Sequence, residues 1–380
     1  MSEEMSFDNL GINEALLRGV YSYGFEKPSL IQHKSIPIIN EKKDIIAQSQ
    51  SGTGKTGAFS IGALNLIDES LLKTQILIIS PTRELTEQTH NVINEISSYM
   101  KIKSAKAVGG TSVHQCAEVL RREPHVVIGT PGRIIDMISK RNLVTSDITC
   151  LVIDEADEMM SFGFLPTLQE IIRSMPKDAQ MCLFSATMPQ EMLELTDKFM
   201  SNPEKILVNK EELTLEGISQ YYINAKVNHW KYDVLIDIYD SINISQCIIY
   251  VNSKNKLIEM YQKLVESNFP VGMIHGSLQT DEREYTVKKF REGEIRILLS
   301  TDLMSRGIDV QQLSLVINFD LPREKETYIH RIGRSGRYGR KGVAINFITD
   351  YDMEHMNAIQ EFYNTKIEEM PQDIQNVINV

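Results

Sequence analysis

A short glycine-rich segment, Ser49–Thr56, has the residue types and spacing of a phosphate-binding loop. It follows an apolar run at 44–47 and precedes a helical pattern that starts near Gly57, the strand, loop and helix order that such loops need. Glycines let backbone N–H groups approach the phosphates of a nucleotide. Lys55 would reach the β- and γ-phosphates, and the Thr56 hydroxyl would hold Mg²⁺. The other loop residues expected at the nucleotide are Ser51, Gly52, Thr53 and Gly54.

Two adjacent carboxylates, Asp154 and Glu155, come directly after the apolar run at 150–153. At the carboxyl end of a parallel strand they would point into the crevice where ligands bind. Asp154 suits Mg²⁺ held through water, and Glu155 suits orienting or deprotonating an attacking water. The plainer alternatives are an acidic helix N-terminus here and a turn of small residues at Ser49–Thr56. The two segments together favour nucleotide hydrolysis.

Four arginines, at 331, 334, 337 and 340, repeat every third residue near the C-terminus. A solvated basic helix face is the ordinary interpretation of such a pattern. However, glycines at 333, 336 and 339 would interrupt a regular helix. Glycine beside arginine fits a close approach to a polyanion better.

Two series of short apolar runs must position these residues. Because strands buried on both faces and separated by helices are typical of parallel sheets, we expect an α/β fold with two tandem domains, each a mostly parallel sheet with helices on both faces. The domains are predicted at 1–208 and 218–380, joined by a polar linker at 209–217. A helix after the run at 247–251 should bury Leu257, Tyr261, Leu264 and Val265. The runs are 76–79, 126–128, 151–153 and 181–184, then 247–251, 297–299, 315–317 and 343–345.

The composition excludes several classes of protein. The chain has 380 residues, 42% hydrophobic and 24% charged, as in ordinary globular domains. No apolar run reaches the roughly 18 residues that span a membrane, and the acidic start is unlike a signal peptide. The four cysteines form no C-x-x-C pair, so a reducing compartment is expected. The net charge of −11 argues against loose binding of polyanions, although a local basic groove remains compatible with it.

The motifs resemble, in order, those of the DEAD-box RNA helicases. Asp154–Asp157 spells the family's name, and the segment from Gly24 to Gln32, with the upstream Phe7, resembles its Q motif. Ser185-Ala186-Thr187 resembles the coupling motif, and 300–309 and 330–337 resemble motifs V and VI. The resemblance runs from about Phe7 to Met370 and implies that both domains are RecA-like. Within the family it is strongest to members that act in translation initiation and in the exon junction complex.

The resemblance implies a role for each matching residue. Gln32 would read the adenine of ATP, whose N6 and N7 offer one donor and one acceptor, and Phe25, otherwise a core aromatic, would stack on the base with Tyr338. Arg334 and Arg337 would be arginine fingers on the γ-phosphate. His330 would link the γ-phosphate region to the coupling residues Asp157, Ser185 and Thr187, with a structural histidine as the alternative. Gly307 and Asp309 would also line the nucleotide. The RNA contacts implied are Pro81, Arg83, Gly109, Gly110, Thr130, Pro131, Gly132, Arg133, Thr301 and Arg306.

The second half has no Gly-Lys-Thr loop of its own. We therefore expect a composite site in which the first domain binds ATP and Mg²⁺ and the second completes it on closure. Contacts to phosphate and sugar carry no base information, so single-stranded or locally unwound RNA would bind with little sequence preference. The function expected is RNA-stimulated ATP hydrolysis coupled to local duplex opening in translation initiation.

Two other functions remain open. One is an ATP-locked RNA clamp of the exon-junction type, and the other is a DNA-translocating helicase, for whose extra domains this chain has no room. We further expect a monomer that does not associate with a membrane. Its expected location is the cytoplasm or, alternatively, the nucleus. It would work with scaffold or regulatory proteins of the translation or RNA-processing machinery.

Overall fold

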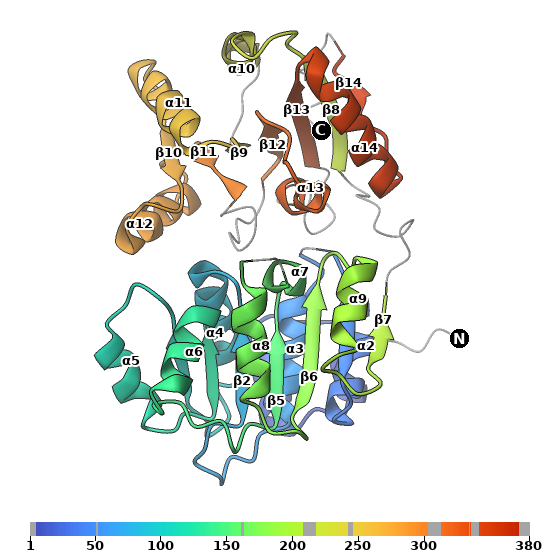
Figure 1. The fold of residues 1–380 in the computed structure, drawn as a ribbon, viewed down its shortest axis with the longest axis vertical. Helices are drawn as coiled ribbons and strands as arrows, with labels where there is room; N and C mark the ends of the chain where they lie inside the picture. The colour runs from blue at the N-terminus through green and yellow to red at the C-terminus, as the bar shows by residue number, and fades with distance from the viewer. Residues whose placement is uncertain are drawn as a thin grey trace. The chain divides into compact units, whose positions relative to one another are not determined.

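The chain forms two compact units, Met1–Val208 and Asn209–Val380, each built on its own seven-stranded sheet (Figure 1). The computed structural model describes residues 5–50, 52–160, 163–207, 218–241, 246–302, 313–333, 335 and 342–371. Every pair of neighbouring strands in both sheets is parallel. The predicted α/β fold with a parallel sheet in each half is thereby confirmed.

The first sheet has the strand order β3-β4-β2-β5-β6-β1-β7. Its strands are β1 Ile45–Gln48, β2 Ile76–Ile79, β3 Ser104–Ala107, β4 Val126–Gly129, β5 Cys150–Ile153, β6 Gln180–Ser185 and β7 Glu204–Ile206. The helices are η1 Phe7–Asn9, α1 Glu14–Ser22, α2 Leu30–Asn40, α3 Lys55–Asn65, α4 Arg83–Ile96, α5 Val113–Leu120, α6 Pro131–Ser139, α7 Ala156–Met159, α8 Leu165–Arg173 and α9 Gln190–Thr196.

Helices cover both faces of this sheet. Helices α1 to α4 pack on one face and α5 to α9 on the other (Figure 1). Successive residues of β5 alternate between the two cores, with Val152 in one and Ile153 in the other, and both are fully buried. A strand covered on both sides needs apolar residues at every position, which explains the continuous apolar runs of the sequence.

The second sheet has the strand order β10-β11-β9-β12-β13-β8-β14. Its strands are β8 Ile218–Asn224, β9 Cys247–Tyr250, β10 Val271–Ile274, β11 Ile297–Ser300, β12 Leu315–Asn318, β13 Gly342–Ile348 and β14 Glu368–Glu369. The helices are α10 Trp230–Ser241, α11 Lys254–Glu266, α12 Thr280–Arg291, α13 Lys325–Ile332, η3 Asp350–Asp352 and α14 Met353–Tyr363.

Here α10 and α11 pack on one face of the sheet, and α12, α13 and α14 on the other. The predicted buried face of α11 was wrong at one residue. Val265 is 46% exposed, whereas Met260 is 4% exposed and packs with Leu257 and Leu264. Residues four apart, such as 260 and 264, lie one above the other on a helix, so the apolar stripe runs through Met260 and leaves Val265 facing solvent.

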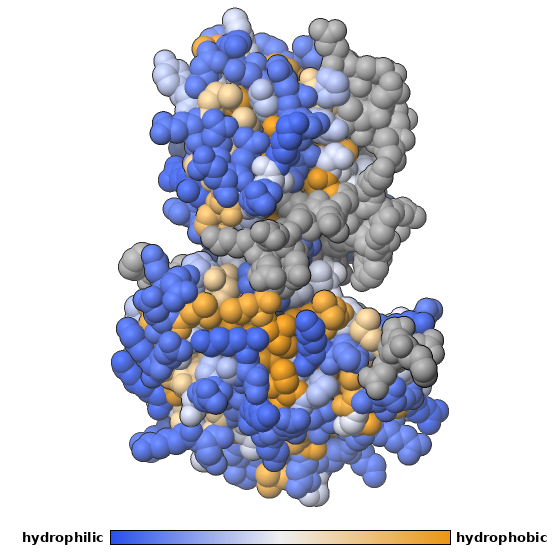
Figure 2. All heavy atoms as spheres, turned by 90° about the vertical axis from the view of Figure 1, so that its right-hand side faces the viewer, coloured by the Kyte–Doolittle hydropathy of each residue, from blue (hydrophilic) through white to orange (hydrophobic). Residues whose placement is uncertain are grey.

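Most of the surface seen in Figure 2 is hydrophilic, and hydrophobic residues gather in a band on the first unit. Large hydrophobic side chains exposed on this unit include Leu30, at the start of α2, and Leu207, just after β7. Contiguous exposed apolar surface often marks an interaction site. Among the helices that the structure describes, none has both the length and the apolar character needed to cross a bilayer.

Candidate nucleotide and RNA site

Apart from Phe25 and Gln32, which precede β1, the candidate site residues of the first unit lie at or just after the carboxyl ends of its strands. The phosphate loop follows β1, the carboxylates follow β5, and Ser185 ends β6. The candidate RNA segments follow β2, β3 and β4. Because all these strands are parallel, their carboxyl ends meet at one edge of the sheet, which is where open α/β folds bind ligands.

The phosphate loop is a tight turn that runs into α3. Gly52 and Gly54 have φ values of +82° and +101°, which side chains other than glycine rarely adopt. Gly54 caps α3, so the helix begins at Lys55, two residues earlier than expected. The Lys55 ammonium is buried and donates to the backbone oxygens of Ser49 at 2.7 Å and Gln50 at 3.2 Å. It thus lies folded across the loop, where the phosphates of a nucleotide would replace these carbonyl oxygens.

The Q-motif residues Gln32 and Phe25 pack directly against this turn. Gln32 Oε1 accepts from the Ser29 backbone N–H at 2.8 Å, and Nε2 donates to the Gly54 oxygen at 3.2 Å. A Cβ added at Gly57 would lie 2.6 Å from Gln32 Nε2 and 3.1 Å from the Phe25 ring, so the helix must carry glycine there. A primary amide has two N–H donors and two lone pairs on oxygen. Gln32 therefore keeps one donor and one acceptor for a base.

Asp154 and Glu155 are both buried, at 3% and 5% exposure. Burial and then the neighbouring Glu155 carboxylate raise the pKa of Asp154 to about 7, although Lys55 opposes the shift. Glu155 has φ +47°, a left-handed conformation that costs a non-glycine residue about 1–3 kcal/mol. Glu155 is the N-cap residue of α7, so the chain leaves the extended conformation of β5 at this residue and enters the helix. Strain of this kind is typical of functional sites.

The donor set fits a magnesium nucleotide. Glu155 Oε2 is a buried carboxylate oxygen without a hydrogen-bond partner among the described residues. Buried polar groups normally have partners, and a water molecule or a metal ion commonly supplies the partner where the protein does not. Thr56 lies half-buried in the first turn of α3 and offers a hydroxyl. Hydroxyl and carboxylate oxygens are the ligands that Mg²⁺ prefers.

The loop after β6 links the phosphate loop to the carboxylates. Thr187 Oγ1 donates to Asp157 Oδ2 at 2.6 Å, and the Asp157 N–H donates to Ser185 Oγ at 3.3 Å. On the other side, the Ser49 N–H donates to the Ser185 oxygen at 3.0 Å. The structure therefore brings the three expected coupling residues together. These bonds connect the phosphate loop, the end of β6 and the start of α7.

Two of the candidate RNA loops are joined by Arg83 at the start of α4. A Cβ added at Gly110, which has φ +78°, would collide with the Arg83 guanidinium, so that group lies directly against the glycine. The Gly109 N–H donates to Thr130 Oγ1 at 3.4 Å, which connects the loop after β3 to the loop after β4. Gly132 is exposed, with open space around its Cα. Backbone N–H groups and a guanidinium thus gather beside one another, a combination suited to phosphate.

Arg133 lies deeper than the sequence interpretation expected. It is 8% exposed, and its guanidinium donates to Thr111 Oγ1 at 3.1 Å and to the Thr111 oxygen at 2.9 Å. Its described contacts therefore fasten the loop that contains Gly109 and Gly110 to α6. Thr111 was missed by sequence reasoning, and a threonine after two glycines gives no signal of such a bond. Pro81 and Pro131 are buried at the bases of their loops.

In the second unit, Thr301 follows β11 and is half-buried, and His330 is fully buried on α13. Next to His330, Arg331 is also fully buried and makes four hydrogen bonds. Sequence reasoning assigned Arg331 no role, although its three-residue spacing to Arg334 was a signal. The remaining predicted site residues lie outside the described residues: Ser51, Arg306, Gly307, Asp309, Arg334, Arg337 and Tyr338.

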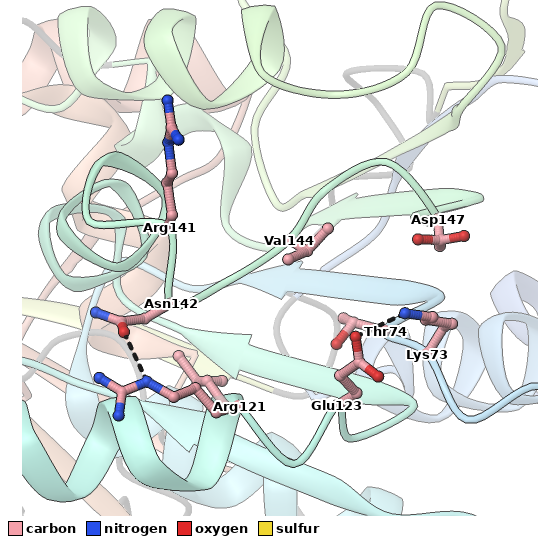
Figure 3. A pocket seen from close by; sticks show the side chains of 9 residues that line it. Lys73, Thr74, Arg121, Glu123, Arg141, Asn142, Val144 and Asp147 are labelled. Carbon is pink, nitrogen blue, oxygen red and sulfur yellow. Dashed lines mark hydrogen bonds and ion pairs between the residues drawn. The ribbon is translucent and has the colours of Figure 1, made fainter.

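A small polar pocket of about 200 Å³ lies at the other edge of the first sheet, before β2, β4 and β5 (Figure 3). Lys73 and Glu123 form an ion pair of 2.7 Å across it, and Arg121 Nε donates to Asn142 Oδ1 at 3.1 Å. Lys73 and Glu123 therefore pair with each other, and Arg121 is held by a neutral amide. Because the pocket is at the amino ends of the strands, it is separate from the candidate site.

Two family models match the chain. The model described as DEAD/DEAH box helicase matches residues 29–195, and the one described as Helicase conserved C-terminal domain matches residues 230–339. The first match contains the phosphate loop, the carboxylates and the coupling residues. The second contains Thr301, His330 and Arg331.

Curated relatives match over nearly the whole chain. A protein named ATP-dependent RNA helicase eIF4A from Candida albicans is 52% identical over 368 residues, which cover 97% of this chain and 93% of the relative. A Caenorhabditis elegans protein named eukaryotic initiation factor 4A is 49% identical over 373 residues, covering 98% of this chain and 93% of the relative.

A solved structure supports the same similarity. Saccharomyces cerevisiae Dbp5 bound to RNA and ADP BeF3 superposes with a TM-score of 0.91 at 36% identity. The match covers 96% of this chain and 95% of that chain.

Proposed function

The chain belongs to the DEAD-box family of ATP-dependent RNA helicases, and from that premise we propose that it opens short RNA duplexes during translation initiation. Its similarity to relatives named for initiation supports this process over a clamp of the exon-junction type. We place the protein in the cytoplasm, as a monomer that works with scaffold proteins. The hydrophobic band on the first unit is surface that such partners could use (Figure 2).

We assign ATP to the loop after β1, with Gln32 and Phe25 at the base and Lys55 at the β- and γ-phosphates. Thr56 and Asp154 would hold Mg²⁺, which neutralises charge on the phosphates. Glu155 would take the proton of the attacking water, because its Oε2 is buried and without a partner among the described residues. Arg334, Arg337, Tyr338, Gly307 and Asp309 would complete the site from the second unit.

We assign RNA to the loops after β2, β3 and β4 in the first unit and to Thr301 and Arg306 in the second. The observation that carries the proposal is that these loops of the first unit share one sheet edge with the phosphate loop and the carboxylates. Backbone and guanidinium donors at Gly109, Gly110 and Arg83 suit a phosphate chain. They do not read base edges, so affinity should depend little on sequence.

ATP turnover measured with matched RNA and DNA oligonucleotides tests this function. Single-stranded RNA should stimulate turnover far more than DNA of the same sequence, because the 2′-hydroxyl distinguishes the two. Several unrelated RNA sequences should stimulate equally. Equal stimulation by DNA would contradict the RNA-specific function, and a strong preference for one RNA sequence would reveal a base-reading surface.

A further inference from the structure

Arg331, on α13 of the second unit, has a fully buried guanidinium that joins the carboxyl ends of three strands. Its Nε donates to Asp302 Oδ1, after β11, at 2.5 Å. One terminal nitrogen donates to Asn318 Oδ1, in β12, at 3.2 Å and to the Asp320 oxygen at 2.6 Å. The other donates to Asn252 Oδ1, after β9, at 2.7 Å. Four donors of one side chain therefore fix α13 to β9, β11 and β12.

The groups that accept from Arg331 are themselves held in place. Asn252 Nδ2 donates to the Leu321 oxygen at 2.7 Å, and its N–H donates to Asp320 Oδ2 at 3.1 Å. Asn318 Nδ2 donates to Asn346 Oδ1, in β13, at 2.8 Å. A planar guanidinium surrounded by fixed acceptors has one allowed position. The arrangement therefore holds the last turn of α13 against the carboxyl ends of β9, β11 and β12.

The segment that follows α13 carries Arg334. The helix ends at Ile332, and Ser335 forms a parallel bridge with Leu313 and donates through its hydroxyl to the Ile332 oxygen at 2.9 Å. In the sequence, Arg334 follows Arg331 by three residues and directly precedes Ser335, and both of these described residues are held by hydrogen bonds.

We propose that Arg331 is a positioning residue for ATP hydrolysis, which sets the start of the segment that carries Arg334 and Arg337, and is not itself an arginine finger. This inference rests on the proposed function. A fully buried guanidinium with four hydrogen bonds is not available to reach a phosphate. Stability alone does not require a charge here, because well-packed apolar residues often replace buried ionic groups without loss.

The test compares Arg331→Lys with wild type in the full-length protein at saturating RNA. Lysine keeps the charge, but its ammonium cannot reproduce the planar fork that reaches three strand ends. Small misplacement of a catalytic group costs up to about 100-fold in rate, so we expect kcat to fall by about 10- to 100-fold. The KM for ATP should change less than kcat, because the phosphate loop, Gln32 and Phe25 are in the first unit and supply most of the ground-state binding.

Asn252→Ala provides a second, milder variant, since Asn252 is half-buried and its loss removes one acceptor of Arg331. It should lower kcat in the same direction, and the double variant should lose less than the two single losses combined, because the two residues act together. If Arg331→Lys does not fold, the kcat of Asn252→Ala alone tests the proposal.

Tyr239→Phe is the matched control. Tyr239 is half-buried on α10, and its hydroxyl lies 2.6 Å from Cys247 Sγ at the start of β9. None of its described contacts involves α13, Asn252, Asn318 or Asp320. Loss of this hydroxyl should lower Tm in thermal unfolding without changing kcat at temperatures where the protein is folded.

Three outcomes would overturn the inference: unchanged kcat in folded Arg331→Lys and Asn252→Ala, a KM that rises while kcat is unchanged, or an equal kcat loss in Tyr239→Phe. The rise in KM would instead place Arg331 on the nucleotide. If wild type itself shows no RNA-stimulated ATPase, the proposed function fails, and that result is separate from any of these.

Discussion

Thr187 Oγ1 donates a hydrogen bond of 2.6 Å to the Asp157 carboxylate, which joins the loop after β6 to the helix that follows Glu155. The same β6 loop accepts from the phosphate loop at Ser185. Hydrogen bonds therefore connect the phosphate loop to the segment that carries Asp154 and Glu155, at one edge of the sheet of the first unit. We expect a bound nucleotide to alter the neighbouring loops through this connection.

Thr187→Val keeps the shape of the side chain and removes the donor to Asp157. A hydrogen bond to a charged group is worth about 1.5–3 kcal/mol, or about 10- to 100-fold in a rate that depends on it. We expect duplex opening to fall by about that factor while RNA-stimulated ATP turnover stays within about 3-fold. Both rates come from parallel assays on the same RNA. An equal decrease in the two rates would show that the bond supports catalysis and does not couple it.

Glu155→Gln keeps the size of the side chain and removes the base. Because general-base catalysis contributes about 10²–10⁴-fold, turnover should fall by that factor while ATP and RNA still bind. Turnover and equilibrium binding are measured on the same preparation. Glu95→Gln, an exposed carboxylate of α4, is the control and should behave as wild type. Near-normal turnover in Glu155→Gln would remove this residue from the mechanism.

Gln32→Glu removes the amide donor to the Gly54 oxygen and to adenine but keeps the oxygen that accepts from Ser29. A site that reads a base through hydrogen bonds loses discrimination when the reading group is changed. The ratio of ATP to GTP affinity should therefore fall, and Gln32→Ala should lower ATP affinity further because the cap to Ser29 is lost as well. The assignment fails if wild type already uses GTP as well as ATP.

Gly57→Ala adds a Cβ where Gln32 and Phe25 already touch the helix. Overpacking of this kind costs about 1–3 kcal/mol, and displacement of the two side chains should weaken ATP binding by about 10-fold or more. Binding of RNA in the absence of nucleotide should be unaffected. The control is Gly163→Ala, because no atom lies within 4 Å of a Cβ built there. Unchanged ATP affinity in Gly57→Ala would separate the Q motif from the nucleotide.

RNA and ATP should bind cooperatively to the full-length protein, because we propose a site that both units complete. Linkage requires that each ligand raise the affinity for the other by the same factor, usually about 5- to 150-fold. Two titrations measure it: ATP analogue with and without RNA, and RNA with and without analogue. Independent binding of the two ligands would contradict a composite site.

The strands and the position of the candidate phosphate loop could be predicted from the sequence alone. Buried parallel strands must be apolar at every position, so runs such as 76–79 and 150–153 were visible directly. Residue type and spacing likewise marked Lys55 and Asp154, because a phosphate turn needs glycines and a following lysine. These requirements involve residues that are close in the sequence, so they can be recognised from the sequence alone.

Which loops lie beside one another became clear only from the tertiary structure. The order β3-β4-β2-β5-β6-β1-β7 places strands far apart in the chain beside each other. The bonds from Arg133 to Thr111 and from Arg331 to Asn252 span 22 and 79 residues. The exposure of Val265 was also not predictable from the sequence, because a helix can turn either of two adjacent apolar residues toward the core. Such contacts depend on crossovers and packing, and no pattern within either partner's own segment encodes them.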